Sequence, residues 1–248
     1  MQLLKTTLFA ALTVSLIGCQ SLFQPASNQP ITPQRIAWEH TQPGCQADDC
    51  PLVNIDTLKF TDQPQLNALI EQRLLEMTLD SPGDPLPASL QSYERNFLAG
   101  AQPGWSSYLQ AKVREQHDGL LILELSSYLA TGGAHGMPGR RLINYDRKLE
   151  KALTLQDMLL PGQEDAFWKL AQQAHRRWLA AEKLDQDGEY QQTWPFQETA
   201  NVALSRGAVL LKYDVYSIAP YSSGHPELKI PYPQLNGVLK PQYFPGRG

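Results

Sequence analysis

Hydrophobic and polar residues alternate in two early segments of the chain, residues 35–41 and 52–60. In the second segment Val53 and Ile55 alternate with polar residues such as Asn54. A period of two is typical of a strand that buries one face. We therefore expect two strands, one on each side of a loop.

The hydrophobic period then changes to the three-to-four-residue spacing of amphipathic helices. One helix is predicted between Pro64 and Pro82, a second over residues 88–99 and a third over residues 164–183. In the third helix His175 is expected on the solvated, polar face. The residues expected to face the core are Leu66, Leu69, Ile70, Leu74 and Met77 in the first helix, Leu90, Tyr93 and Phe97 in the second, and Phe167, Leu170, Ala171, Ala174 and Trp178 in the third.

A hairpin is predicted in the middle of the chain, where residues 105–116 and 120–129 flank Asp118 and Gly119. Asp-Gly between two such segments is a strong hairpin signal because both residues tolerate positive φ. The second arm is apolar on both faces, which is typical of a central strand. Further strands are expected over residues 141–146, 208–213 and 228–230.

The N-terminus carries Lys5 and then a short apolar segment, residues 8–17, which ends at Gly18 and Cys19. The segment is too short for a membrane-spanning helix, which needs about 20 residues, and it is typical of a secretory signal peptide. The small Gly18 would let a peptidase approach the bond before Cys19, whose thiol would then carry a lipid. The alternative is an ordinary signal peptide in which the cysteine has no such role.

The residue after this cysteine is Gln20, and no Asp stands there. By resemblance to Gram-negative lipoproteins, this favours an outer-membrane protein that faces the periplasm. The sequence shows no second apolar segment of membrane-spanning length, so we expect the lipid to be the anchor.

The order of the predicted elements indicates an α+β fold, an antiparallel β-sheet with helices packed on one side. The segment after the signal peptide is rich in Gln, Ser, Pro and Asn without any period, as a flexible tether would be. The expected organisation is a signal peptide over residues 1–18, a tether over 19–33, an N-terminal α+β subdomain over 34–115 and a C-terminal α+β domain over 116–248.

Composition limits the possible partners. Lys and Arg number 21 and Asp and Glu number 25, which gives a net charge of −4 at pH 7, and 42% of the residues are hydrophobic. A globular core is therefore expected, whereas nucleic acid is not expected as a partner.

Cys45 and Cys50 remain once Cys19 is assigned to the lipid. In an oxidising periplasm they would form a small disulfide loop. The alternative is a metal site that adds His40 and two nearby aspartates. Zinc motifs usually bring a second Cys or His pair at defined spacing, and none follows.

Two segments combine glycine with aromatic and hydroxyl side chains. Residues 127–136 end the apolar strand and place three glycines around His135, which indicates a turn with unusual φ angles. Residues 213–224 form the second segment. If their strands are neighbours, the two loops would form a single rim that suits a sugar or a glycosidase cleft. The residues expected to bind there are Tyr128, Gly132, Gly133, His135, Gly136, Pro220, Tyr221, Ser222 and Gly224.

With residues 144–146 and Asn201, these segments resemble the C-terminal domain of RsiV-like proteins, a domain of unknown function. Its best understood member is a membrane-anchored anti-sigma factor that binds lysozyme. The resemblance covers about residues 120–238, and residues 34–115 are more weakly similar to the small domain that often precedes it. Glu150 stands where the family often has glycine. The resemblance implies a fold and a tendency to bind a cell-wall enzyme or glycan; without a transmembrane helix or a sigma-binding segment, an anti-sigma role is not expected.

Catalytic signatures are absent from the sequence. It has no Gly-x-Ser-x-Gly elbow, and the candidate acid for glycan hydrolysis is Asp146. We therefore expect a non-enzymatic lipoprotein without a metal or other cofactor, which binds a lysozyme-like muramidase or peptidoglycan as an inhibitor or envelope sensor. The alternative is a metal-dependent envelope glycan hydrolase or deacetylase that uses His135, Asp146 and a bound metal, with His225 as a further ligand.

Overall fold

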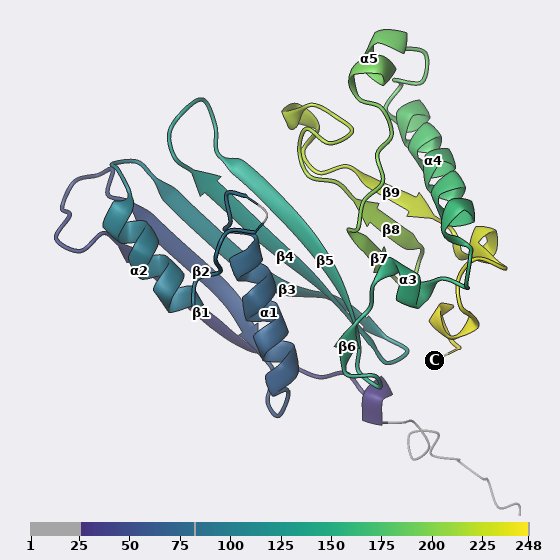
Figure 1. Cartoon of the computed structure of the whole chain (residues 1–248), viewed down its shortest axis with the longest axis horizontal. Coiled ribbons are helices and arrows are strands. Elements are labelled where there is room, and N and C mark those ends of the chain that lie inside the picture. The colour runs from purple at the N-terminus through teal and green to yellow at the C-terminus, as the bar shows by residue number, and fades with distance from the viewer. Residues whose placement is uncertain (1–25, 82, 248) are drawn as a thin grey trace, which may run out of the picture.

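A computed structural model describes residues 26–81 and 83–247 of the chain (Figure 1). The signal peptide, Cys19 and the first part of the tether lie outside these residues. Within the described part, no helix combines the length and the apolar character needed to cross a bilayer.

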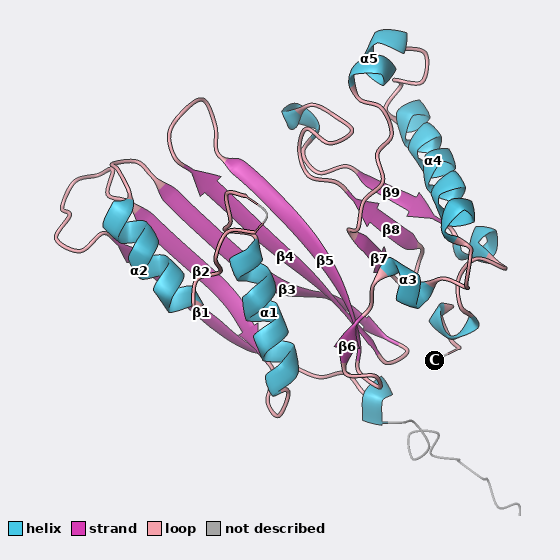
Figure 2. Cartoon of the chain, in the orientation of Figure 1, coloured by secondary structure: helices cyan, strands magenta, loops and turns pink. Residues whose placement is uncertain are grey.

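A six-stranded sheet forms the larger half of the molecule (Figure 2). Its strands follow the chain order from β1 to β6, and every neighbouring pair is antiparallel except β2 and β3. That pair is parallel because two helices separate the strands in sequence and return the chain to the same end of the sheet. The strands are β1 (Gln34–Thr41), β2 (Leu52–Lys59), β3 (Ser106–His117), β4 (Leu120–Ala130), β5 (Met137–Asp146) and β6 (Lys151–Ala152).

Helices α1 (Pro64–Glu76) and α2 (Leu90–Gly100) cover one face of this sheet, as Figure 2 shows. A proline opens α1, and the Ser89 side chain caps α2 by accepting the backbone N–H of Ser92. Beneath the helices lies a core that includes Val53, Ile55, Leu66, Ile70, Leu74, Leu109, Leu121, Leu123 and Leu125.

A second lobe packs near the opposite face. Its sheet consists of β7 (Val202–Leu204), β8 (Val209–Lys212) and β9 (Glu227–Ile230), all antiparallel. The helices of this lobe are α3 (Leu155–Met158), α4 (Glu164–Ala181) and α5 (Gly188–Thr193). Short 3-10 helices span Ala26–Asn28, Tyr221–Ser223, Tyr232–Leu235 and Pro241–Tyr243.

Strand β4 connects the two cores because its side chains point alternately to each. Leu121 and Leu123 face α1 and α2, whereas Leu120 and Ile122 join the core of the second lobe. The α+β class and the central position predicted for this strand are thus confirmed. The division expected between residues 115 and 116 falls inside β3, and the sheet continues through it.

Turn chemistry also agrees with the sequence. Asp118 and Gly119 form the β3–β4 turn with φ of 48° and 80°. Glu150 adopts a φ of 52° in the turn before β6, so it supplies the left-handed conformation for which glycine is the usual choice.

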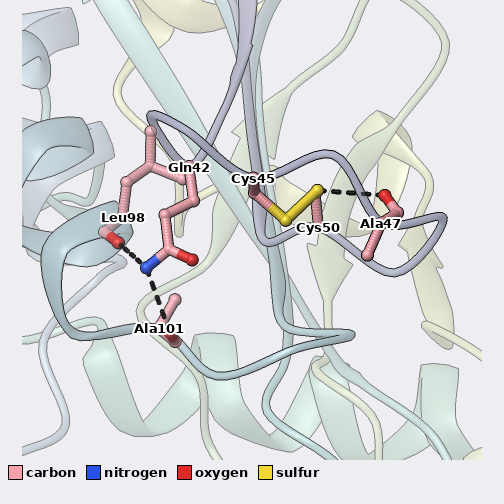
Figure 3. Close-up of a disulfide and its surroundings, with 6 residues drawn as sticks. All are labelled: Gln42, Cys45, Ala47, Cys50, Leu98 and Ala101. Carbon is pink, nitrogen blue, oxygen red and sulfur yellow. Dashed lines mark hydrogen bonds between the residues drawn. A yellow bond between two sulfur atoms is a disulfide. The ribbon is translucent and has the colours of Figure 1, made fainter.

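The β1–β2 loop contains the expected disulfide between Cys45 and Cys50 (Figure 3). The side-chain amide of Gln42 fastens the same loop to the end of α2, since Nε2 donates to the carbonyl of Leu98 at 2.9 Å. This loop is therefore held both by a covalent closure and by the helix beside it.

The expectation for His175 was wrong. Its residue is 5% exposed, and its ring packs against Trp178 and Phe196. Burial, followed by the charge of Arg176, lowers its pKa, so this histidine is neutral near pH 7. Phe196 belongs to the segment after α5, which folds back onto α4. The helical period of α4 could not indicate this contact.

Candidate functional site

The two glycine- and tyrosine-containing loops meet at one end of the six-stranded sheet. The ring of Tyr221 stacks on that of His135, with centroids 3.8 Å apart. The Tyr221 hydroxyl also donates to the carbonyl of Gly136 at 3.1 Å. Residues separated by 85 positions in sequence are thereby joined, so the two loops lie on one rim although their strands belong to different sheets and are not neighbours.

Gly136 is the point where the turn fits most tightly. Its N–H donates to the Tyr128 hydroxyl at 3.3 Å, and a Cβ at this position would lie 2.6 Å from the same oxygen. A Cβ would also lie 2.8 Å from the backbone carbonyl oxygen of Leu129, which cannot move aside as a side chain can, so glycine is required. Gly132 and Gly133 have φ of 93° and 86°, which allows the chain to reverse before His135.

Tyr216 was not among the residues predicted for the site, yet it is central to it. It is 45% exposed, its hydroxyl lies 3.2 Å from His135 Nε2, and its ring lies 5.7 Å from that of Tyr221. Its φ is 64°, in the left-handed region that a bulky residue rarely occupies. Such strain is characteristic of functional positions.

Trp194 completes the group from the segment that follows α5. Its ring stacks on Tyr216 with centroids 6.3 Å apart. No pattern in the sequence pointed to this residue, because it follows a polar segment without a hydrophobic period. We call His135, Trp194, Tyr216 and Tyr221 the aromatic cluster.

The other residues predicted for the rim give the second loop its shape. Pro220 precedes the 3-10 turn Tyr221–Ser223, and Gly224 ends it with a φ of 65°. Ser222 is exposed within that turn. Pro220 and Gly224 thus bound the turn that carries Tyr221.

Asp214 fixes the second loop to the edge of β5. One carboxylate oxygen accepts the backbone N–H of Arg140 at 2.8 Å, and the other accepts the side chain of Arg141 at 2.6 Å. Because Tyr216 lies two residues further along, this attachment positions the exposed ring.

Two asparagines of the signature segments also join the lobes. Asn201 accepts the N–H of Leu142 at 2.5 Å and donates to the carbonyl of Arg140 at 3.0 Å. Asn144 accepts the N–H of Leu204 at 2.7 Å and donates to the carbonyl of Val202 at 2.7 Å. Each side-chain amide thus pairs with a strand as a peptide group would, and the role of both residues is structural.

The residues considered for a metal site are dispersed. Asp146 accepts the N–H groups of Lys148 and Leu149 at 2.9 and 3.0 Å, so it caps a turn. His135 precedes β5 and Asp146 ends it, which separates them by about 30 Å along the strand. Among the described residues no three His, Cys, Asp or Glu side chains are grouped to hold a metal.

His225 lies in the second loop but faces its interior. Its Nδ1 is 3.1 Å from the carbonyl of Tyr213. Burial, followed by the charge of Arg140, lowers the pKa of this histidine, and the same burial raises that of Tyr213. Both groups are neutral near pH 7, and their contact lies at the base of the loop.

Known proteins are similar to this chain in sequence or in fold. A family described as a protein of unknown function (DUF3298) matches residues 156–233. The crystal structure of a DUF3298 family protein from Pseudomonas aeruginosa PAO1 is 68% identical and has a TM-score of 0.86, covering 89% of this chain and 100% of its own. A family member from Bacteroides fragilis NCTC 9343 is 19% identical with a TM-score of 0.65, covering 86% of this chain and 94% of its own, which is a likeness of fold. No curated protein matches the chain.

Proposed function

The chain belongs to the DUF3298 family. We propose that it is a lipid-anchored envelope protein whose aromatic cluster binds a lysozyme-like muramidase. The resemblance of residues 120–238 to the lysozyme-binding RsiV-like domain supports this choice of partner. The observation that carries the proposal is the exposed ring of Tyr216, which lies between Trp194 and His135. The backbone of Tyr216 has a φ of 64°.

Aromatic rings that are fixed before binding are effective contacts. They contribute a large apolar area and a hydroxyl or ring nitrogen while losing little rotamer freedom. In this cluster, stacking on His135 and the hydrogen bond to Gly136 already restrict Tyr221. Binding therefore orders few additional groups.

The location of the aromatic cluster suits a protein that is tethered by its N-terminus. Gln116 holds the end of the tether by accepting the N–H of Ile31 at 2.9 Å and donating to its carbonyl at 2.8 Å. That point lies beside the β3–β4 turn, whereas the cluster lies at the other end of β4, about 35 Å away along the strand. A lipid on Cys19 and a bound enzyme would therefore occupy different ends of the sheet.

The proposed action is inhibition by occupation of the enzyme's cleft. Glycosidase clefts stack sugar rings against aromatic and polar side chains, and a projecting tyrosine with its hydroxyl can take the same place. Inhibition should then be stoichiometric. Peptidoglycan itself is the second candidate ligand, because stacked tyrosine rings also suit sugar faces.

The test uses the full chain, extracted from membranes in detergent and mixed with c-type lysozyme. We expect hydrolysis of sacculi to fall to zero near an equimolar ratio. Tyr216→Ala should relieve the inhibition. Leu149→Ala is the control, since Leu149 is 56% exposed in the turn after β5 and lies away from the cluster.

Undiminished hydrolysis at large excess, together with no complex in sedimentation, would refute the proposal. Co-pelleting of the chain with sacculi, abolished by Tyr216→Ala, would assign the aromatic cluster to the glycan. Release of acetate or sugar that EDTA stops would support the hydrolase alternative.

A further inference from the structure

Strand β1 is the outer strand of the six-stranded sheet, and among the described residues it pairs with β2 alone. The backbone N–H of Gln42 donates to the carbonyl of Pro51 at 2.9 Å. The register continues unbroken from Thr41 opposite Leu52. Hydrogen-bonded pairs alternate along an antiparallel ladder, so even-numbered residues of β1 direct their peptide groups toward β2.

The odd-numbered residues of β1 therefore direct their N–H and C=O groups away from the sheet. Proteins usually protect such an edge with charged side chains, proline, a bulge or a covering segment. The charges of β1, Arg35 and Glu39, are of opposite sign and so do not repel a second copy that places one opposite the other. Strand β1 spans eight residues without proline, and its register shows no bulge. Within residues 26–81 and 83–247 no partner meets the outward peptide groups of Arg35, Ala37, Glu39 and Thr41.

The edge is held in a fixed conformation. The indole Nε1 of Trp38 donates to one carboxylate oxygen of Glu94 in α2, and His40 Nδ1 contacts the other. Glu94 is 8% exposed, so this attachment is largely shielded from water. A partner would meet a strand that is already extended and ordered, which reduces the entropy lost on association.

The sequence of the strand is complementary to itself. If a second copy runs antiparallel with a twofold axis at Ala37, Arg35 of each copy lies opposite Glu39 of the other. On the face toward α1 and α2, the half-buried Ile36 of each copy lies opposite Trp38 of the other. An interface formed by the same patch on both subunits has this reciprocal character.

Charge selects this register over its neighbours. Arg35 is held by Asp56 at 2.7 Å, and Glu39 accepts a hydrogen bond from Asn54 at 2.7 Å. The guanidinium has five N–H groups, so it can bind a second carboxylate without releasing the first. A shift by two residues would place Arg35 opposite Thr41 and Glu39 opposite Ala37, leaving both charges without an opposite charge across the new interface.

We propose that two copies of this chain associate through β1, continuing the six-stranded sheet across a twofold axis at Ala37. Three residue pairs would exchange hydrogen bonds across the axis: the central alanines and the two Arg35–Glu39 pairs. The inference is independent of the function proposed for the aromatic cluster, because the cluster lies beyond β4 and does not use β1.

Cysteine cross-linking tests this register directly in the full chain. Opposed residues of a hydrogen-bonded pair have Cα atoms about 5.5 Å apart, within the range of a disulfide. Ala37→Cys should therefore give a product of doubled mass on a non-reducing gel. Glu39→Cys is the matched control: it is equally exposed on the same strand, yet its copies would lie roughly 14 Å apart.

A mixture of Arg35→Cys chains with Glu39→Cys chains should restore the cross-link, because these positions face one another. Sedimentation should also give a dimer for the unmodified chain and a monomer for Ala37→Arg, which places two like charges on the axis. A monomeric unmodified chain, equal cross-linking at positions 37 and 39, or cross-linking to a different protein would each overturn the proposal.

Discussion

The two edges of the six-stranded sheet are completed in different ways. On one side β6 pairs with only two residues of β5, and Asn201 and Asp214 bind the backbone groups of Arg140 and Leu142 that a longer strand would otherwise bind. At the β1 edge no side chain of the described residues takes this role. Closing one edge with side chains joins the lobes and positions the aromatic cluster, whereas the open edge leaves peptide groups available to another chain.

The largest effect is expected at Asn201, which is 6% exposed at the side of β5. Asn201→Leu removes both amide hydrogen bonds and leaves the buried N–H of Leu142 without a partner, while the carbonyl of Arg140 keeps only the hydrogen bond from the Arg141 side chain. We expect the free energy of unfolding to fall by about 2–4 kcal/mol, measured by urea denaturation.

Asn236→Ala is the control for this variant, because its amide bonds only the carbonyl of Pro233 at an exposed site. Equal losses for the two variants would show that the closed edge does not depend on the Asn201 amide.

The surface that the closed edge positions is tested by Tyr221→Ala. We expect binding of c-type lysozyme to weaken by about 1–4 kcal/mol, as for the loss of an interface anchor, measured by titration calorimetry. The melting temperature should change little because Tyr221 is only partly buried. A large loss of stability with unaltered affinity would instead make Tyr221 a packing residue.

At the open edge, Glu94→Gln weakens the attachment of Trp38 and His40 to α2. Hydrogen bonds to a charged group are worth more than those to an amide, so we expect unfolding to become easier by about 1–2 kcal/mol. Thermal denaturation measures the change, with the exposed Glu189→Gln as control. Amide hydrogen exchange in β1 should rise in the first variant; unchanged exchange would contradict the role given to Glu94.

The smallest effect on stability is expected at the ion pair between Lys151 of β6 and Asp157 of α3. Lys151 donates to Asp157 at 2.7 Å, and this bond, followed by the N–H of Thr154, lowers the pKa of Asp157 to about 2. A carboxyl with a lowered pKa stabilises the fold fully at pH values above its ordinary pKa of 3.8. This contribution is lost as the pH falls toward 2.

Because the pair is solvent-exposed, the contribution should stay below about 1 kcal/mol. Urea denaturation over a pH series should show a shallower acid decline for Asp157→Asn than for the unmodified chain. Identical declines would mean that this pair does not stabilise β6.

Local patterns were sufficient for most of the elements. Alternation in β2, the helical period of α1 and the Asp118-Gly119 turn depend on contacts between near neighbours, and the structure confirms all three. The pattern gave no indication of α5 or β7, because α5 is polar and β7 has only three residues. Strand β5 begins at Met137, before the expected residue 141, since pairing with β4 extends it past Pro138 and Gly139.

For the candidate site too, local sequence accounts for some features and tertiary contacts for the others. The sequence alone indicated turns at residues 132–136 and 220–224, because glycine at positive φ and a polar–aromatic composition are local properties. Tertiary structure decided that His135 meets Tyr216 and Tyr221, that Trp194 joins them, and that His175 is buried. The contacts of His135 depend on how Asn201 and Asp214 dock one lobe on the other, and those of Trp194 and His175 on how the second lobe folds on itself. Both are arrangements of distant segments that no period in the chain encodes.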